Sequence, residues 1–491
     1  MSNENSYLFE AWKEHPISRR TLLGSLMVSF LASTSLGRAL GVGQPVITQI
    51  LGRPTNSSIA VSLLATEKIT AYVEYGYSKS KYSGKSSTVT LSAGVPQVIE
   101  LISLKPNSRI YYRLRYLTSN SKTAQAGKQY SFSTQKNKAV SFTFSLQGDT
   151  HPERAGKMFN SELYYVTMAN IASQQPDFHI LLGDDFSIDP LIDKGAANQA
   201  NVEQIYRTHR DWLSVVGNSV PIFLVNGNHE QAAAYLLDGT TNNPAVLAGN
   251  ARLKYYALPA PNTFYSGDST EIPGVGLPRD YYSWTWGDAL FISLDPYWHS
   301  KFAVDNVAGK GDGSSKVKDL WQVGIGDEQY SWLKRTLEES SAKFKFIFAH
   351  HVLGTGRGGV EVSTNYEWGG VDPKGISTFA KERPNWELPI HDLMVRNGVS
   401  IFFQGHDHIF VHQERDGVVY QSMPNPADDT FTLFNDSAYR SGTKAANSGH
   451  VRVSVSSTEA KVEYFLAART KDAGRKNLEI AHSYTVKPSS K

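Results

Sequence analysis

Short runs in which hydrophobic and polar residues alternate occupy the chain between about residues 45 and 135. Alternation with a period of two residues is typical of half-buried β-strands. Four runs are long enough to predict strands, at 59–64, 71–75, 97–102 and 110–116. Clusters of Pro, Asn and Ser separate these runs, and such residues favour turns. The pattern predicts a small all-β sandwich over residues 45–135.

The pattern changes after about residue 139. Apolar runs of four to six residues now alternate with helix-like stretches, of which 158–173 and 328–340 are examples. Such alternation predicts helices packed on sheet layers, the α/β class. Strand-like alternation returns at 451–455 and 460–464, and we expect these strands to complete a sheet. The second domain is therefore predicted to cover residues 138–487.

The first 44 residues have a different character. Ser18, Arg19 and Arg20 lead into Thr21-Leu22-Leu23 and an apolar stretch through about Leu36. This order resembles a bacterial twin-arginine export signal. An amphipathic N-terminal helix and an uncleaved membrane anchor are the alternatives. We therefore expect an exported protein, periplasmic or secreted, that meets the membrane only through residues 1–44.

Charge and cysteine content narrow the chemistry. The 49 Lys and Arg residues nearly balance the 46 Asp and Glu residues, and basic residues form no long run. The composition therefore gives no indication of nucleic-acid binding. The chain contains no cysteine, which excludes disulfides, a cysteine nucleophile and thiolate metal sites. A metal would have to bind to His, Asp, Glu or Asn.

Side chains able to bind metal follow five predicted strands directly. The strands are predicted at 142–146, 178–182, 221–225, 345–348 and 399–403. The polar groups after them, in the same order, are Asp149 and His151, then Asp184, then Asn228 and His229, then His350 and His351, then His406 and His408. The carboxyl ends of strands form the ligand crevice in α/β sheets, so we expect these groups to converge.

These residue types suit a pair of metal ions. Imidazole binds Zn and Fe, carboxylates suit Mn and can bridge two cations, and an amide oxygen adds a neutral ligand. Two cations about 4 Å apart can share a hydroxide and stabilise the transition state of phosphoryl transfer. The pattern therefore predicts metal-dependent hydrolysis.

The ordered set D-x-H, GD, GNHE, H and GHxH resembles the calcineurin-like metallophosphoesterase family. Leu104-x-Pro106 and Tyr111-Tyr112-x-Leu114 also resemble a fibronectin type III pattern, in which a Tyr near the start of a late strand braces a corner. Together the two are similar to the purple-acid-phosphatase-like branch of the family. This resemblance implies a layered α/β/β/α sandwich preceded by a fibronectin type III-like domain. It also implies two ions of Fe, Mn or Zn, and a phosphate ester as substrate.

The resemblance assigns roles to individual residues. One metal would be held by Asp149, His151, Asp184 and His408, with Asp184 bridging to the second. The second would be completed by Asn228, His350 and His406. His229 would protonate the leaving oxygen or stabilise the phosphoryl charge, while Glu230 would position the loop. Metal-bound hydroxide would attack a phosphate monoester.

The sequence departs from the family pattern in two places, both at one position. Purple acid phosphatases carry a metal-binding Tyr three residues after the bridging Asp, and here that position is Ser187. With His151 available instead, the purple tyrosinate colour is expected to be missing. Many relatives place an Asp at that position to orient the catalytic His, so Asp185 and Asp189 are the candidates for that role.

Several alternatives stay open. His351 competes with His350 as a ligand, and Arg357 and Trp368 are candidates for contact with the substrate. His179 lies in an apolar run and is expected in the core. The remaining histidines are expected to be structural or solvated: His15, His209, His299, His391, His412, His450 and His482. Two functional alternatives are a phosphodiesterase acting on nucleotides, phospholipids or a cell-surface polymer, and a non-catalytic binding protein with a vestigial metal site.

Overall fold

The computed structural model describes residues 45–230, 237–300, 320–352, 356–372 and 374–489. The elements below all lie in the compact unit formed by residues 47–491. The predicted export segment, residues 1–44, lies outside the described residues. In the described part of the chain, no helix is both long enough and apolar enough to cross a membrane.

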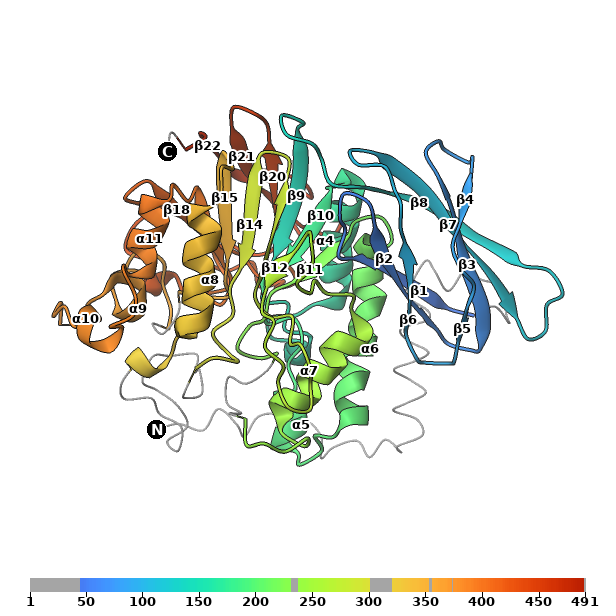
Figure 1. The fold of residues 1–491 in the computed structure, drawn as a ribbon, viewed down its shortest axis with the longest axis horizontal. Coiled ribbons are helices and arrows are strands. Elements are labelled where there is room, and N and C mark those ends of the chain that lie inside the picture. The colour runs from blue at the N-terminus through green and yellow to red at the C-terminus, as the bar shows by residue number, and fades with distance from the viewer. Residues whose placement is uncertain (1–44, 231–236, 301–319, 353–355, 373, 490–491) are drawn as a thin grey trace. The chain divides into compact units, whose positions relative to one another are not determined.

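Residues 47–133 form an antiparallel β-sandwich, drawn from blue to teal in Figure 1. One side consists of β1 (Ile47–Gly52), β2 (Ile59–Ala65) and β6 (Gln97–Leu101). The other consists of β3 (Ile69–Gly76), β4 (Gly84–Lys85), β5 (Val89–Leu91), β7 (Arg109–Thr118) and β8 (Gln125–Ser133). Val61 and Ile99 from the first side pack with Val73 and Leu114 from the second in one buried cluster. The predicted all-β sandwich is confirmed.

The rest of the chain contributes two mixed sheets. The first contains β9 (Phe142–Gln147), β10 (Phe178–Leu181), β11 (Ile222–Leu224), β20 (Gly449–Val455), β21 (Ala460–Leu466) and β22 (Ile480–Val486). Its order is β22-β21-β20-β9-β10-β11, and it continues through β1, β2 and β6 of the sandwich as one nine-stranded sheet. Strands β9, β10 and β11 run parallel. The predicted C-terminal strands complete this sheet, because β20 pairs antiparallel with β9.

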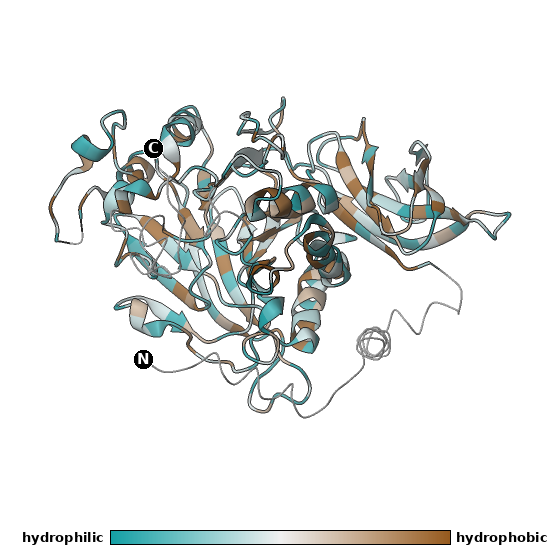
Figure 2. Cartoon of the chain, turned by 90° about the horizontal axis from the view of Figure 1, so that it is seen from below, coloured by the Kyte–Doolittle hydropathy of each residue, from teal (hydrophilic) through white to brown (hydrophobic). Residues whose placement is uncertain are grey.

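The second sheet has eight strands, in the order β12-β13-β14-β15-β16-β18-β17-β19. They are β12 (Ser266–Gly267), β13 (Tyr282–Trp286), β14 (Ala289–Ser293), β15 (Phe344–Phe348), β16 (Ile401–Gln404), β17 (Phe410–Arg415), β18 (Val418–Ser422) and β19 (Thr443–Ala445). Aromatic side chains join the two sheets: the Phe291 ring lies 5.2 Å from Phe144 and 5.1 Å from Phe178, centroid to centroid. Figure 2 shows brown, hydrophobic stretches along the strands and teal, polar stretches in the surrounding loops.

Helices cover the outer faces of both sheets (Figure 1). The first group is α4 (Ser161–Gln174), α5 (Asp189–Asp193), α6 (Gln199–Gly217) and α7 (Pro244–Tyr255). The second is α8 (Gly326–Glu338), α9 (Tyr366–Gly369), α10 (Phe379–Glu382) and α11 (Ile390–Arg396). Leu333 of α8 and Leu393 of α11 pack with Ile347 and Phe402 on the outer face of the second sheet. The predicted α/β/β/α layering is confirmed.

The first predicted helix begins later than its hydrophobic pattern suggested. Asn160 is its N-cap, because the Asn160 side chain accepts hydrogen bonds from the backbone N–H groups of Glu162 and Leu163. A capping side chain of this kind satisfies donors that have no partner within the helix. The helix therefore starts at Ser161 rather than at Met158.

The β-sandwich is attached directly to the first sheet. Its strand β1 pairs in parallel with β11 through Gly52 and Ile222. Tyr112, from the fibronectin-like motif, donates its hydroxyl hydrogen bond to the Asn218 carbonyl oxygen at 2.6 Å, just beyond α6. The tyrosine that braces a corner of its own domain in the fibronectin pattern here joins the sandwich to the α/β layers.

Arg210 on α6 provides a second connection. Its side chain is fully buried and donates to Thr48 Oγ1 at 3.1 Å, to Ser62 O at 2.9 Å and to the Tyr255 carbonyl. Burial lowers the pKa of this guanidinium to about 10, so it stays charged at neutral pH.

Replacing Arg210 with methionine is expected to destabilise the fold by about 3 kcal/mol, because buried acceptors on β1, β2 and α7 lose their donors. Urea unfolding measures this free energy. The matched control is Arg207→Met, one turn earlier on α6 with its side chain partly exposed, and we expect a change below about 0.5 kcal/mol. Equal destabilisation by the two variants would rule out a connecting role for Arg210.

Candidate metal centre

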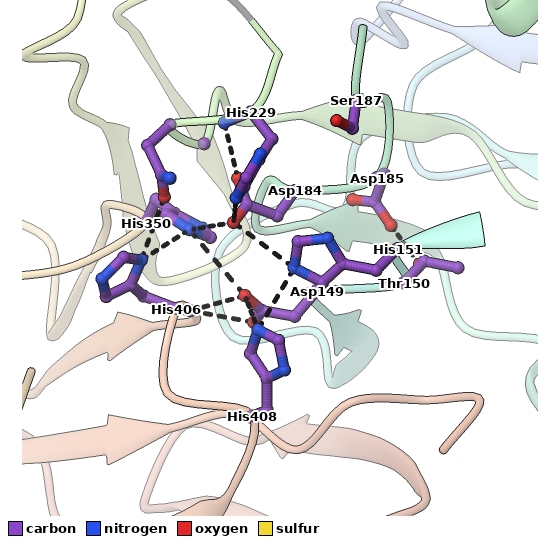
Figure 3. Close-up of polar contacts among 12 residues, drawn as sticks. Asp149, Thr150, His151, Asp184, Asp185, Ser187, His229, His350, His406 and His408 are labelled. Atoms are coloured by element: carbon purple, nitrogen blue, oxygen red, sulfur yellow. Dashed lines mark hydrogen bonds and ion pairs between the residues drawn. The ribbon is translucent and has the colours of Figure 1, made fainter. Parts of the chain in front are cut away.

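The five predicted motifs meet at one place in the structure (Figure 3). Each follows the carboxyl end of its strand, as the sequence indicates. The strands β9, β10 and β11 belong to the first sheet, whereas β15 and β16 belong to the second. The cluster therefore bridges the two sheets rather than following the edge of one.

Asp149, His151 and His408 form the first group of candidate ligands. His408 Nε2 lies 3.3 Å from Asp149 Oδ1. His151 Nε2 lies 3.1 Å from His408 Nε2. All three side chains are buried, so one small cation would contact all of them away from bulk water.

Asp184, His350 and His406 form the second group. His350 Nε2 lies 3.0 Å from Asp184 Oδ2 and 3.2 Å from His406 Nδ1. Asn228 joins this group through its amide oxygen, which lies 3.0 Å from His406 Nδ1. The second group therefore contains the amide, carboxylate and two imidazoles that the resemblance implies.

Asp184 lies between the two groups. Its Oδ2 atom is 3.0 Å from His350 Nε2 in one group and 3.5 Å from His151 Nε2 in the other. A single carboxylate within reach of both sets of ligands is placed to bridge two cations.

The donor set fits metal ions. His350 donates from Nδ1 to the Leu182 carbonyl at 2.8 Å, and His151 donates from Nδ1 to Glu153 Oε1 at 2.8 Å. In a neutral ring each Nε2 atom is then an acceptor. Both Nε2 atoms nevertheless face Asp184 Oδ2, which is also an acceptor. A cation between them removes this conflict, and a second hydrogen bond on the far nitrogen is the usual arrangement for histidines that bind metal.

The pKa values of these histidines agree with this reading. Burial and the neighbouring His408 hold the pKa of His151 well below its usual range, which keeps the ring neutral. Burial also opposes protonation of His350, but Asp184 and Asp149 raise its pKa to about 10. The carboxylates thus favour positive charge at His350 Nε2, and a metal ion supplies that charge.

The backbone around the centre is unusual in its torsion angles. Asp149, Asp184 and His406 have φ values of 61°, 59° and 68°, in the left-handed region, which costs free energy for residues other than glycine. Glycines allow the chain to come close: a Cβ atom at Gly405 would lie 2.6 Å from Asp149 Oδ2. The His406 N–H donates to both Asp149 carboxylate oxygens, at 2.8 and 2.9 Å, which fixes the two loops together.

Glu230 fixes the next pair of loops. Its buried carboxylate accepts from the backbone N–H groups of Asp184, Asp185 and Gly227 at 2.8, 2.6 and 2.6 Å. These bonds connect the loop after β10 to the loop after β11. Glu230 therefore positions Asp184 and does not itself face the cluster.

His229 lies at the rim, with its side chain 11% exposed. Its Nδ1 donates to Asp189 Oδ2 at 2.5 Å, which leaves Nε2 3.9 Å from Asp184 Oδ2. Burial disfavours the charged ring, but Asp184 and Asp189 raise the pKa of His229 to about 9. Of the two candidates to orient His229, the structure selects Asp189. The other, Asp185, accepts from the Thr150 hydroxyl instead.

The sequence analysis missed Arg154. Its Nη2 lies 3.2 Å from His229 Nε2, and its side chain is one-third exposed at 33%. It comes from the short helix η1 (Pro152–Arg154) directly after the D-x-H motif. The only indication in the sequence was that Arg154 lies three residues after His151, close to a predicted metal ligand.

His350, not His351, belongs to the second group. His351 Nδ1 lies 2.9 Å from the Tyr297 hydroxyl, and the His351 ring stacks on His406 with centroids 4.7 Å apart. The other two candidates for contact with the substrate differ in position: Arg357 lies against the second ligand group, whereas Trp368 lies in the core. Arg357 donates to the His406 carbonyl and to Asp407. Trp368 is fully buried and donates to the Tyr420 hydroxyl at 2.8 Å, so its proposed contact with a substrate was wrong.

His179 is a core residue, as expected. It is buried, and its Nδ1 lies 2.8 Å from the Ser145 hydroxyl. Burial lowers its pKa to about 3, so the ring is neutral.

Ser187 is buried and lies apart from the metal-binding groups (Figure 3). The protein loaded with iron is therefore expected to show no tyrosinate charge-transfer band in the visible spectrum, and absorption spectroscopy measures this directly. Tyr297→Phe is the control, because Tyr297 is the buried tyrosine beside His351. A purple band that disappears in this variant would show that Tyr297 binds the metal.

Two facing sheets with buried Asp and His groups at the carboxyl ends of strands from both define a metallophosphoesterase-type α/β protein. Comparison of sequences supports this class: the profile described as "Calcineurin-like phosphoesterase" matches residues 142–410, more than half of the chain. The chain belongs to the calcineurin-like phosphoesterase family. No curated protein sequence matches it.

Solved structures show the same fold. A purple acid phosphatase, PPD1, from yellow lupin (Lupinus luteus) seeds is similar with a TM-score of 0.57 and 16% identity, over 90% of this chain and 74% of that one. GAP50, the anchor in the inner membrane complex of Plasmodium, reaches a TM-score of only 0.36 and 13% identity, over 72% of this chain and 90% of that one. At 16% identity, the similarity to the lupin protein shows a shared fold and nothing about function. The TM-score for GAP50 is too low to support a conclusion.

Proposed function

We propose that the protein hydrolyses phosphate monoesters at a centre of two metal ions, of Fe, Mn or Zn. The observation that carries this proposal is the Asp184 carboxylate placed between two buried groups of ligands. When bound, two such ions supply an activated water and neutralise the phosphoryl oxygens. Family membership makes a phosphate ester the natural substrate class.

The residues of the chain would hold the two metal ions and fix their positions. Asp149, His151, Asp184 and His408 would hold one ion, and Asp184, Asn228, His350 and His406 the other. The loops that carry these ligands are held in place by Glu230 and by the His406 N–H. Pre-positioned ligands of this kind cost no reorganisation during the reaction.

His229 would protonate the leaving oxygen. Its Nδ1 is held by Asp189, so Nε2 is the atom that faces the substrate, and a raised pKa keeps a proton on the ring at neutral pH. General acid catalysis of this kind contributes roughly 10²–10⁴-fold to rate. Arg154 beside it adds a positive charge at the rim, which suits the dianionic phosphoryl group of a monoester.

A panel of phosphate mono- and diesters tests this proposal. The protein reconstituted with metal should turn over p-nitrophenyl phosphate faster than bis(p-nitrophenyl) phosphate. Preference for the diester, or for nucleotide, phospholipid or polymer diesters, would replace the monoesterase by the phosphodiesterase alternative. A metal-loaded protein that hydrolyses none of them would be the non-catalytic binding protein.

We further propose export through a twin-arginine-type signal in residues 1–44, supported by Arg19 and Arg20 before the apolar stretch. This route transports folded proteins, so the metal ions would be loaded before export. A reporter fused to residues 1–45 should be exported, and the change Arg19→Lys with Arg20→Lys should abolish export. Export that survives this change would contradict the proposal.

A further inference from the structure

A second cluster of acidic and imidazole side chains lies outside the metal centre. Asp268, Asp280 and His299 each place one ligand atom within 4.8 Å of the others. Asp268 follows β12 and Asp280 precedes β13, and these strands pair antiparallel. His299 comes from the turn after β14. None of the three belongs to a motif of the catalytic centre, and the sequence predicted His299 to be structural or solvated.

The two carboxylates are buried without a full set of partners. Asp268 is 1% exposed and Asp280 is 0% exposed. Asp280 Oδ1 has no hydrogen-bond partner among the described residues, and Asp268 Oδ2 has none there besides the neighbouring Tyr281 hydroxyl. Buried oxygens of this kind are costly, because water that would solvate them has been removed and nothing replaces it.

With both carboxylates ionised, the cluster carries more negative charge than its imidazole can neutralise. Across the described residues, the ion pairs give these two carboxylates a single basic partner, His299, whose Nε2 lies 2.8 Å from Asp280 Oδ2. One imidazolium neutralises one carboxylate and leaves the other uncompensated. A divalent cation with a neutral imidazole neutralises both and occupies the unpartnered oxygens.

We propose that Asp268, Asp280 and His299 bind a third metal ion, separate from the dinuclear centre. Two carboxylates and one imidazole form a mixed oxygen and nitrogen set, which suits a divalent transition-metal ion such as Zn²⁺ or Mn²⁺. Calcium and magnesium prefer oxygen ligands alone. The third ion ties the turn after β14 to the β12–β13 pair.

That turn also contacts the catalytic loops. Asp295 accepts a hydrogen bond from the Asn226 side chain, two residues before Asn228. Tyr297 contacts His351 through its hydroxyl, 2.9 Å from Nδ1. An ion bound to His299 therefore holds the segment that supports the second group of ligands, and its role is in positioning rather than in the reaction.

Zinc binding to the metal-stripped full chain tests this site. We expect three equivalents of Zn²⁺ per chain by metal analysis after dialysis, and two for the variant Asp268→Asn with Asp280→Asn. The control Glu271→Gln removes an exposed carboxylate from the same segment and should still bind three. Two equivalents in the unchanged protein, or equal binding by the unchanged protein and the double variant, would overturn the third site.

Crystals of the unchanged protein grown with Zn²⁺ give a test that does not depend on folding of the variant. An anomalous difference map at the zinc absorption edge should show a peak between Asp268, Asp280 and His299. Absence of this peak overturns the site. Metal occupancy here is measured without reference to hydrolysis, so an inactive protein with this peak would contradict the proposed function and leave the third site intact.

Discussion

Asp184→Asn is expected to lower hydrolysis of an aryl phosphate by at least about 10³-fold and to reduce the metal content of the purified protein. Asp184 Oδ2 is the atom that lies within 3.5 Å of ligands in both groups. Asparagine keeps the shape of the side chain but removes its charge, and one of its two terminal atoms becomes a donor. Turnover and metal analysis on the same preparation measure both effects.

Asp185→Asn is the matched control for this substitution. Asp185 is the next residue and equally buried, but its carboxyl group accepts from Thr150 and does not face the cluster. Burial and the neighbouring Glu230 raise the pKa of Asp185 well above its usual range, so the neutral amide resembles the acid it replaces. We expect activity within about threefold of the unchanged protein. An Asp184→Asn variant that kept a tenth of its activity would rule out a bridging role.

His229→Ala should lower kcat by roughly 10²–10⁴-fold while both metal ions stay bound. The His229 ring is held by Asp189, and its Nε2 atom is 3.9 Å from Asp184 Oδ2, at the partly exposed rim of the cluster and within 4.8 Å of ligand atoms of His151 and Asp184. If the ring protonates the leaving group, the loss must be greater for alkyl phosphates than for p-nitrophenyl phosphate, because p-nitrophenolate leaves without help.

Asp189→Asn is expected to lower kcat by less than His229→Ala does. It keeps the ring but weakens the bond that orients it, so we expect about a tenfold loss in kcat with unchanged metal content. A His229→Ala variant that lost both metals would show that His229 is a ligand. An equal loss for good and poor leaving groups would show that its charge, and not its proton, contributes to catalysis.

Much of the fold was predictable because its signals are local. The alternation at 59–64 and 110–116 is a property of a few adjacent residues, and it corresponds to β2 and β7. Strand β8 (Gln125–Ser133) was not predicted, since it is largely polar and partly exposed and forms through pairing with β7. The distribution of strands between two sheets depends likewise on pairing between distant segments, which local pattern does not encode.

The site was likewise predictable where its signals are local and unpredictable where distant segments meet. Each ligand motif follows its strand directly, so the seven candidates were visible from the order of residues. The choice between Asp185 and Asp189 depends on how the chain turns into α5, and only the structure brings Asp189 to His229. Asp268, Asp280 and His299 have no motif, because they come from separate strand ends that meet only in the folded chain.

The central claim is that this chain hydrolyses phosphate esters through two metal ions held at the junction of its sheets. The most direct test is turnover of p-nitrophenyl phosphate by the metal-stripped protein before and after reconstitution with Fe, Mn and Zn. We predict no activity without metal, and activity that returns with at least one of these metals and is absent from Asp184→Asn under the same conditions. A folded protein that binds none of the three metals and stays inactive after reconstitution would contradict the claim.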